Sequence, residues 1–167
     1  MTNQSAWIGG QLDAGAIGYQ NAFGAELNVS GGIPNGASIL SSIAFDNSAG
    51  LDQFMDISFV GALSASSAVV AGAALSFFLA VLQNDGVTYG DGRLSPGGAP
   101  VVYQPILNPL PGIPFVAGTI TNLVGDSGLI TLRPRKFALI LTNNTAFTIA
   151  PSGNHCMIST YRQNLNA

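Results

Sequence analysis

Hydrophobic and polar residues alternate with a period of two in several short segments of this chain. Met55–Phe59 reads apolar, polar, apolar, polar, apolar, which predicts a strand with one buried face. Leu75–Leu82 is apolar at every position except Ser76, which predicts a strand buried on both faces. Further strands are predicted at Val101–Ile106, Val116–Val124, Leu129–Leu132, Phe137–Leu141, Phe147–Ile149 and Cys156–Tyr161.

Turn residues separate these segments at intervals of roughly 8 to 12 residues, a spacing typical of sandwiches and barrels. Thr142–Thr145 is expected to form the turn between Phe137–Leu141 and Phe147–Ile149. Prolines between residues 105 and 114 exclude a helix there and restrict any strand to a sheet edge. About eight strands with long Pro- and Gly-rich loops fit a jelly roll. We therefore predict an all-β fold, a jelly-roll-like β-sandwich, with an immunoglobulin-like sandwich as the alternative.

The first fifty residues lack this periodicity. They are rich in Gly, Asn, Ser and Ala, and pairs such as Gly31-Gly32 and Asn35-Gly36 are turn signals. Their isolated apolar residues include Trp7, Ile8, Leu12, Ile17, Tyr19 and Phe23. We predict an extended N-terminal arm over residues 1–50 that packs on other subunits, with a short strand at Ile39–Phe45. A disordered tail is the alternative. The β-sandwich domain is predicted over residues 51–167.

One apolar stretch raises the question of a membrane span. Phe59–Leu82 contains no charged residue and is long enough to cross a bilayer as a helix. Its nearest flanking charges are acidic, and no Lys or Arg is placed to anchor it. The polar cluster Ser64–Ser67 divides the run into two pieces, which two adjacent antiparallel strands would explain. We therefore predict no membrane segment here.

The composition narrows the function. Only 8% of the 167 residues are charged, against roughly 25% in an average soluble domain, while 47% are hydrophobic. A disordered chain would be less hydrophobic and more charged. Five basic residues against eight acidic ones do not give the positive field that a nucleic-acid binder needs. One Glu and one Lys are too few for a helical bundle or a coiled coil.

Candidate catalytic residues are few. The single histidine and the single cysteine, His155 and Cys156, are adjacent on a predicted strand, so their side chains should point to opposite faces. We expect Cys156 to be buried and His155 to lie at the surface or an interface. A zinc site needs three or four nitrogen or sulfur ligands, and two candidates are too few. We predict no catalytic site, no metal site and no cofactor.

Two charged segments remain as candidates. Asp85 and Asp91 are close in sequence, and oxygen ligands at such a spacing could hold Ca²⁺. Because Asp-Gly pairs are typical of hairpin turns, we favour a hairpin loop at this place. Arg133, Arg135 and Lys136 form the only basic cluster. We predict that this cluster contacts an acidic patch on a protein partner, with a solvated loop as the alternative.

Three stretches resemble a group of small virion proteins of tailed bacteriophages. They are the loop Asn84–Gly92 after the buried strand, the segment Pro134–Thr145, and Ala150–Asn154, which leads to the aromatic-basic end Tyr161-Arg162. Together they resemble the capsid decoration or cement proteins over about Ile57 to Arg162. The resemblance implies a jelly-roll-like fold and, often, trimers on the capsid lattice. It brings no catalytic residues.

We therefore predict a non-enzymatic virion structural protein on the outer surface of a phage capsid. It would decorate and stabilise the capsid by binding the major capsid protein and its own copies, as a homotrimer, without nucleic acid or membrane. The predicted partner-binding residues are Trp7, Ile8, Tyr19, Phe23, Arg133, Arg135 and Lys136. The alternatives are a tail, baseplate or head-fibre component, a carbohydrate-binding module and a membrane protein. For sugar binding the candidate aromatic residues, Trp7, Tyr89 and Tyr103, are far apart in sequence.

Overall fold

The computed structural model describes residues 6–9, 20–21, 27, 29–48, 52–83, 85, 87–90, 94, 98–102, 109–116 and 118–164. All regular secondary structure within these ranges is β-strand, which confirms the predicted all-β class. None of the described residues belongs to a helix long and apolar enough to cross a bilayer.

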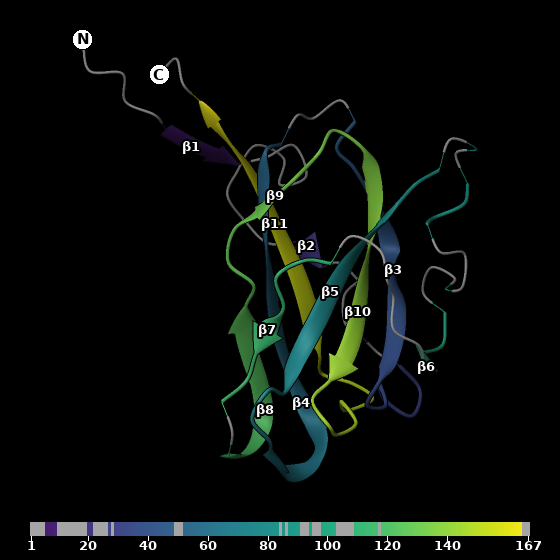
Figure 1. The fold of residues 1–167 in the computed structure, drawn as a ribbon, viewed down its shortest axis with the longest axis vertical. Coiled ribbons are helices and arrows are strands. Elements are labelled where there is room, and N and C mark those ends of the chain that lie inside the picture. The colour runs from purple at the N-terminus through teal and green to yellow at the C-terminus, as the bar shows by residue number, and fades with distance from the viewer. Residues whose placement is uncertain are drawn as a thin grey trace.

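Two antiparallel sheets lie face to face (Figure 1). The first has the order β1–β11–β4–β8, and β2 and β9 pair with β11 and β4. The second has the order β6–β3–β10–β5–β7. The strands of the first sheet are β1 (Ala6–Gly9), β2 (Gln20–Asn21), β4 (Phe54–Val69), β8 (Gly118–Asp126), β9 (Ile130–Thr131) and β11 (His155–Asn164). Those of the second are β3 (Ala37–Asp46), β5 (Ala74–Val81), β6 (Val101–Val102), β7 (Ile113–Pro114) and β10 (Lys136–Asn144).

Strands from the beginning of the chain pair with strands from its end. β1 pairs with β11, β3 with β10, β4 with β8, and β5 with β7, all antiparallel. The consecutive strands β3, β4 and β5 alternate between the two sheets. The chain therefore crosses repeatedly from one layer to the other.

The main core fills the space between the sheets. Its largest side chains come from both layers and include Phe45, Phe59 and Phe77, all buried. A second, smaller cluster contains Phe78 of β5 and is covered by Tyr89. Because Phe77 and Phe78 belong to different clusters, β5 is buried on both faces, as the continuous apolar pattern predicted.

The polar cluster Ser64–Ser67 does not divide the apolar run into two strands, contrary to our prediction. β4 runs through it to Val69, and the chain turns at Val70–Ala73, where Gly72 has a φ of 86°. At the serines the pairing of β4 with β8 shifts register, which is the mark of a β-bulge. β4 and β5 are not neighbours either, because they belong to opposite sheets.

The hairpin predicted around Thr142–Thr145 is also wrong. β10 continues to Asn144, and Phe147–Ile149 forms no strand, although Ile149 makes isolated bridges to Ile33 and Leu63. Asn143 explains the difference. Its buried Nδ2 donates 2.7 Å hydrogen bonds to the carbonyl oxygens of Ile33 and Phe147, and these bonds replace those of a ladder.

The boundary at residue 50 needs correction as well. The expected strand Ile39–Phe45 exists, but as the longer β3, which lies between β6 and β10 in the second sheet. Ile33, Ile39 and Phe45 belong to the main core. Residues 29–46 are therefore part of the β-sandwich and not of an arm. The sequence predicted the middle of β3 but not its ends, because burial of Ile39 in the main core and of Leu40 in the second cluster leaves little alternation.

Candidate interaction site at one end of the sandwich

The basic cluster predicted from the sequence lies at the turn between β9 and β10, but the turn divides it. Lys136 begins β10 and lies opposite Asp46 of β3, and its Nζ is 2.8 Å from the Asp46 carboxylate. Arg133 and Arg135 precede it and are exposed. Over the described residues, neither guanidinium has a salt-bridge partner. The two arginines are therefore the part of the cluster with charge available for a partner.

The ion pair of Lys136 changes the titration of both groups. The hydrogen bond from Lys136, with two further hydrogen bonds from Ser48, lowers the pKa of Asp46 to about 2. The same contact with Asp46 raises the pKa of Lys136. Both side chains are half exposed, so the pair joins β3 to β10 without a large energetic contribution.

A buried asparagine fixes the arginine turn. Asn47, which directly follows β3, donates from Nδ2 to the carbonyl oxygen of Arg133 at 3.0 Å and to that of Asp52 at 2.9 Å. Its main-chain N–H donates to the carbonyl oxygen of Arg135 at 3.2 Å. Asp52 in turn accepts a 2.9 Å hydrogen bond from Thr160 of β11. Asn47 thus holds the main chain of the turn, and Asp52 links Asn47 to β11 of the other sheet.

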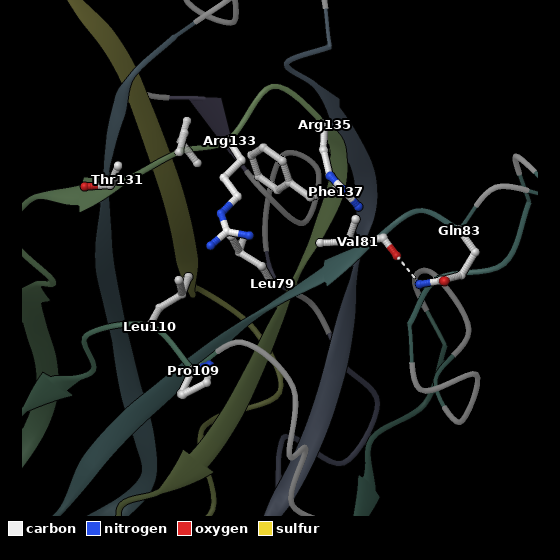
Figure 2. A pocket seen from close by; sticks show the side chains of 10 residues that line it. Leu79, Val81, Gln83, Pro109, Leu110, Thr131, Arg133, Arg135 and Phe137 are labelled. Atoms are coloured by element: carbon white, nitrogen blue, oxygen red, sulfur yellow. Dashed lines mark hydrogen bonds between the residues drawn. The ribbon is translucent and has the colours of Figure 1, made fainter.

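A cleft of about 580 Å³ opens beside this turn (Figure 2). Its lining comes from β5 and the residues just after it, from residues 109–110, and from β9, the start of β10 and the turn between them. The residues that line it are Leu79, Val81, Gln83, Pro109, Leu110, Thr131, Leu132, Arg133, Arg135 and Phe137. β5 and β10 belong to the second sheet and β9 to the first, so the cleft lies where the two layers separate.

The cleft is lined by both apolar and polar side chains, and its charged groups are the two arginines. Figure 2 shows the Arg133 side chain extending over the cleft, above Leu79 and Leu110, with Arg135 on the side of Val81. β7 pairs with β5 only at Ala74 and Leu75, so it does not cover the later part of β5 that lines the cleft. Such a site can bind an anionic group attached to an apolar one.

The sequence pointed to the arginines but not to the rest of the site. Basic residues are rare in this chain, so Arg133 and Arg135 stood out. The apolar walls were read only as a buried strand and a proline-rich connection. Asn47 carried one weak signal, its position in a polar turn after an apolar segment.

The four candidate residues near the N-terminus are placed only in part. Trp7 and Ile8 lie in β1, whose backbone pairs them with Gln163 and Arg162 of β11. Tyr19 and Phe23 lie outside the described residues. The role of this group in partner binding stays a prediction.

His155 and Cys156 lie on opposite faces of β11, as the strand pattern predicted. Cys156 is buried in the main core, and this burial raises the pKa of its thiol. Its nucleophilic thiolate form is therefore disfavoured. Within the part of the chain that the structure describes, no three His, Cys, Asp or Glu residues come close enough to hold a metal ion.

The loop after β5 has the hydrogen bonds of a hairpin. Gln83 donates its N–H to the carbonyl oxygen of Thr88 at 2.8 Å, and Asp85 Oδ1 accepts from the N–H groups of Val87 and Thr88. A hydrogen bond from the Thr88 side chain, together with those from the N–H groups of Thr88 and Val87, lowers the pKa of Asp85. These bonds agree with the predicted turn, while Asp91, the other half of the calcium hypothesis, lies outside the described residues.

Comparisons of the chain with protein-family models, with curated proteins and with solved structures gave no match. The function must therefore be argued from the strand pairing, from the surface and from the arginine cleft.

Proposed function

We propose that the protein is a non-enzymatic structural component of a bacteriophage virion, which decorates and stabilises the capsid by binding the major capsid protein and its own copies. The observation that carries this proposal is the strand pairing. The resemblance of the loop Asn84–Gly92, and of the segments Pro134–Thr145 and Ala150–Asn154, to capsid decoration proteins gives the class of assembly.

The pairing supports a jelly roll as the particular form of the fold. A jelly roll is a long hairpin rolled into two sheets, so early strands pair with late ones. The pairs β1–β11, β3–β10, β4–β8 and β5–β7 follow this order, with alternate pairs in opposite sheets. In an immunoglobulin sandwich the last two strands are neighbours, whereas β10 and β11 lie in different sheets here. The order therefore favours the jelly roll.

The composition of the surface supports a role as a subunit of a larger assembly. Few charges are available to keep the free chain soluble, since 8% of its residues are charged. Large apolar side chains that are exposed in the described part of the chain are Val60, Val70, Val87, Val101, Val102, Val116, Val124 and Leu129. Val60 and Val124 lie directly opposite each other on β4 and β8. Symmetric self-association, as a homotrimer, would cover such surface.

Binding alone can stabilise a capsid shell, and no catalysed reaction is needed. A protein that binds the assembled lattice better than its separated subunits stabilises the lattice by mass action. The partners would be the major capsid protein and further copies of this chain, on the outer surface of the capsid. Arg133 and Arg135 supply exposed charge for such a contact.

Heating tests the proposal directly. Particles with and without this protein are heated, and the temperature at which they release DNA is measured. We expect the decorated particles to release DNA at the higher temperature, and a reconstruction to show trimers on the head. Equal release temperatures, or a subunit found only on the tail, would favour the alternative of a tail, baseplate or head-fibre component.

A further inference from the structure

We propose that the cleft beside the arginine turn binds a short acidic segment of a protein partner. One aliphatic side chain of that segment enters the cleft, and the carboxylate next to it binds Arg133 and Arg135. The inference adds a partner chemistry to the proposed function and relies on it only for the idea that the partner belongs to the same assembly.

The size and walls of the cleft fit an apolar anchor. Its volume of about 580 Å³ lies within the range of roughly 300–1,000 Å³ that is usual for binding pockets. Leu79, Val81 and Leu110 offer aliphatic surface, and Phe137 adds an aromatic ring. An aliphatic side chain buried there leaves water and gains contacts, as in any apolar pocket.

The positive charges of Arg133 and Arg135 at the edge of the cleft favour a negatively charged ligand. Lys136 is neutralised by Asp46, but over the described residues no acidic side chain pairs with Arg133 or Arg135. A guanidinium can bind a carboxylate through two parallel hydrogen bonds. Two guanidinium groups beside the aliphatic side chains of Leu79, Val81 and Leu110 therefore favour an apolar group that carries a carboxylate.

The rim is ordered before any ligand arrives. Asn47 holds the carbonyl oxygens of Arg133 and Arg135 from the opposite side of the turn. Fixing the main chain in advance lowers the entropy that binding must cost. Both arginine side chains are exposed, so a carboxylate can reach them from solvent.

The polar groups around the cleft favour a peptide over a lipid chain. Gln83 and Thr131 line the cleft together with the two arginines, and both have side-chain donors and acceptors that suit a peptide main chain. The Gln83 side chain already donates to a main-chain oxygen, that of Val81 at 3.2 Å. An alkyl chain would gain nothing from these groups.

Three short peptides test the proposal on the full chain. The probe is the acetylated, amidated peptide Gly-Leu-Asp-Gly; the second peptide has Asn in place of Asp, and the third has Ala in place of Leu. Binding is followed by the methyl NMR shifts of Leu79, Val81 and Leu132. We expect saturable shifts with the probe, and binding at least about fivefold weaker with each of the other two, because each lacks one of the two contacts.

Variants locate the contact. R133Q combined with R135Q should weaken binding of the probe to the level of the Asn peptide, without a change in the thermal unfolding midpoint. R162Q, which changes an exposed arginine of β11 outside the cleft lining, should leave binding unchanged.

Three outcomes would overturn the inference. They are equal binding of the Asp and Asn peptides, no effect of the double arginine variant, and saturable binding of dodecanoate in the cleft without binding of the peptide. The test uses the isolated chain and no particles. Failure here therefore leaves the heating experiment on decorated capsids as a separate test of the proposed function.

Discussion

Asn47 donates a hydrogen bond of 3.0 Å from its Nδ2 to the carbonyl oxygen of Arg133, although the two residues are 86 positions apart in the chain. This bond joins the connection after β3 to the turn that carries the exposed arginines. Because Asn47 is buried, its amide has exchanged water for these partners and must keep them. The position of the candidate site therefore depends on a residue outside it.

Replacement of this amide should destabilise the fold. Asn47→Ala removes the donor to Arg133 and Asp52 and the acceptor for the Asp52 N–H. Since buried partners are left unsatisfied, we expect the free energy of unfolding to fall by about 1–3 kcal/mol, measured by urea denaturation. Asn122→Ala on the exposed face of β8 is the matched control and should change stability by less than about 0.5 kcal/mol. Equal effects of the two variants would contradict this role of Asn47.

The sequence could identify the charged part of the site because charge is scarce in this chain. Arg133 and Arg135 stood out against a surface of Ser, Asn and Gly. It could not identify the cleft. That feature depends on where the segment before β7 leaves β5, beyond the bridge between Pro109 and Phe78, and this is set by contacts between segments far apart in the chain. The function of Asn47 was hidden for the same reason.

Two glycines with almost the same backbone conformation should respond differently to alanine. Gly32 has a φ of 77° and Gly36 a φ of 76°, so each alanine adopts a left-handed conformation that costs roughly 1–2 kcal/mol. At Gly32 the new Cβ would collide with the carbonyl oxygen of Ile149, whereas at Gly36 nothing lies within 4 Å. Gly32→Ala should therefore lower the thermal midpoint clearly more than Gly36→Ala. Similar thermal midpoints of the two variants would show that the close approach of Gly32 to Ile149 does not contribute to stability.

The pair of Asp46 and Lys136 makes stability depend on pH in acid. The pKa of Asp46 is about 2 in the fold, against an ordinary value of 3.8. A lowered folded pKa contributes stability that is complete above about pH 4 and is lost as the pH falls through about 2. The urea midpoint of Asp46→Asn should therefore fall less between pH 5 and pH 2 than that of the unchanged chain.

Lys136→Gln tests the cause of that dependence. Lys136 is the largest contributor to the low pKa of Asp46, so this variant should lose part of the same acid sensitivity. The double variant should be no flatter than Asp46→Asn alone. If Asp46→Asn kept the full acid sensitivity, the dependence would come from other groups.

The fold itself was predictable in class but not in its turns. Alternation at Met55–Phe59 and the continuous apolar run of β5 gave real strands, because burial on one or both faces imposes these patterns. The prediction that Ser64–Ser67 separates two strands was wrong, because polar residues can occupy a β-bulge within one strand as well as a turn between two. The hairpin predicted around Asn143 was wrong for a different reason. The Asn143 side chain replaces main-chain hydrogen bonds, and the pattern of hydrophobic and polar residues does not show such side-chain bonds.

Truncation separates an N-terminal arm from the β-sandwich. Removal of residues 1–50 deletes β3, with the buried side chains of Ile39, Leu40 and Phe45. At about 1.5–3 kcal/mol for each large apolar side chain, this loss is comparable with the whole stability of a typical domain, about 5–15 kcal/mol. We expect this chain to show no cooperative unfolding transition in urea.

Removal of residues 1–19 is the informative comparison. It deletes β1, while β11 keeps its pairing with β4 and β3 stays in the second sheet. This shorter chain should unfold cooperatively. On capsids it should raise the temperature of DNA release less than the full chain does, because the predicted arm contacts are lost. Normal stabilisation of particles by the shorter chain would show that the first nineteen residues bind no partner. Failure of that chain to fold would show instead that β1 is part of the structural core.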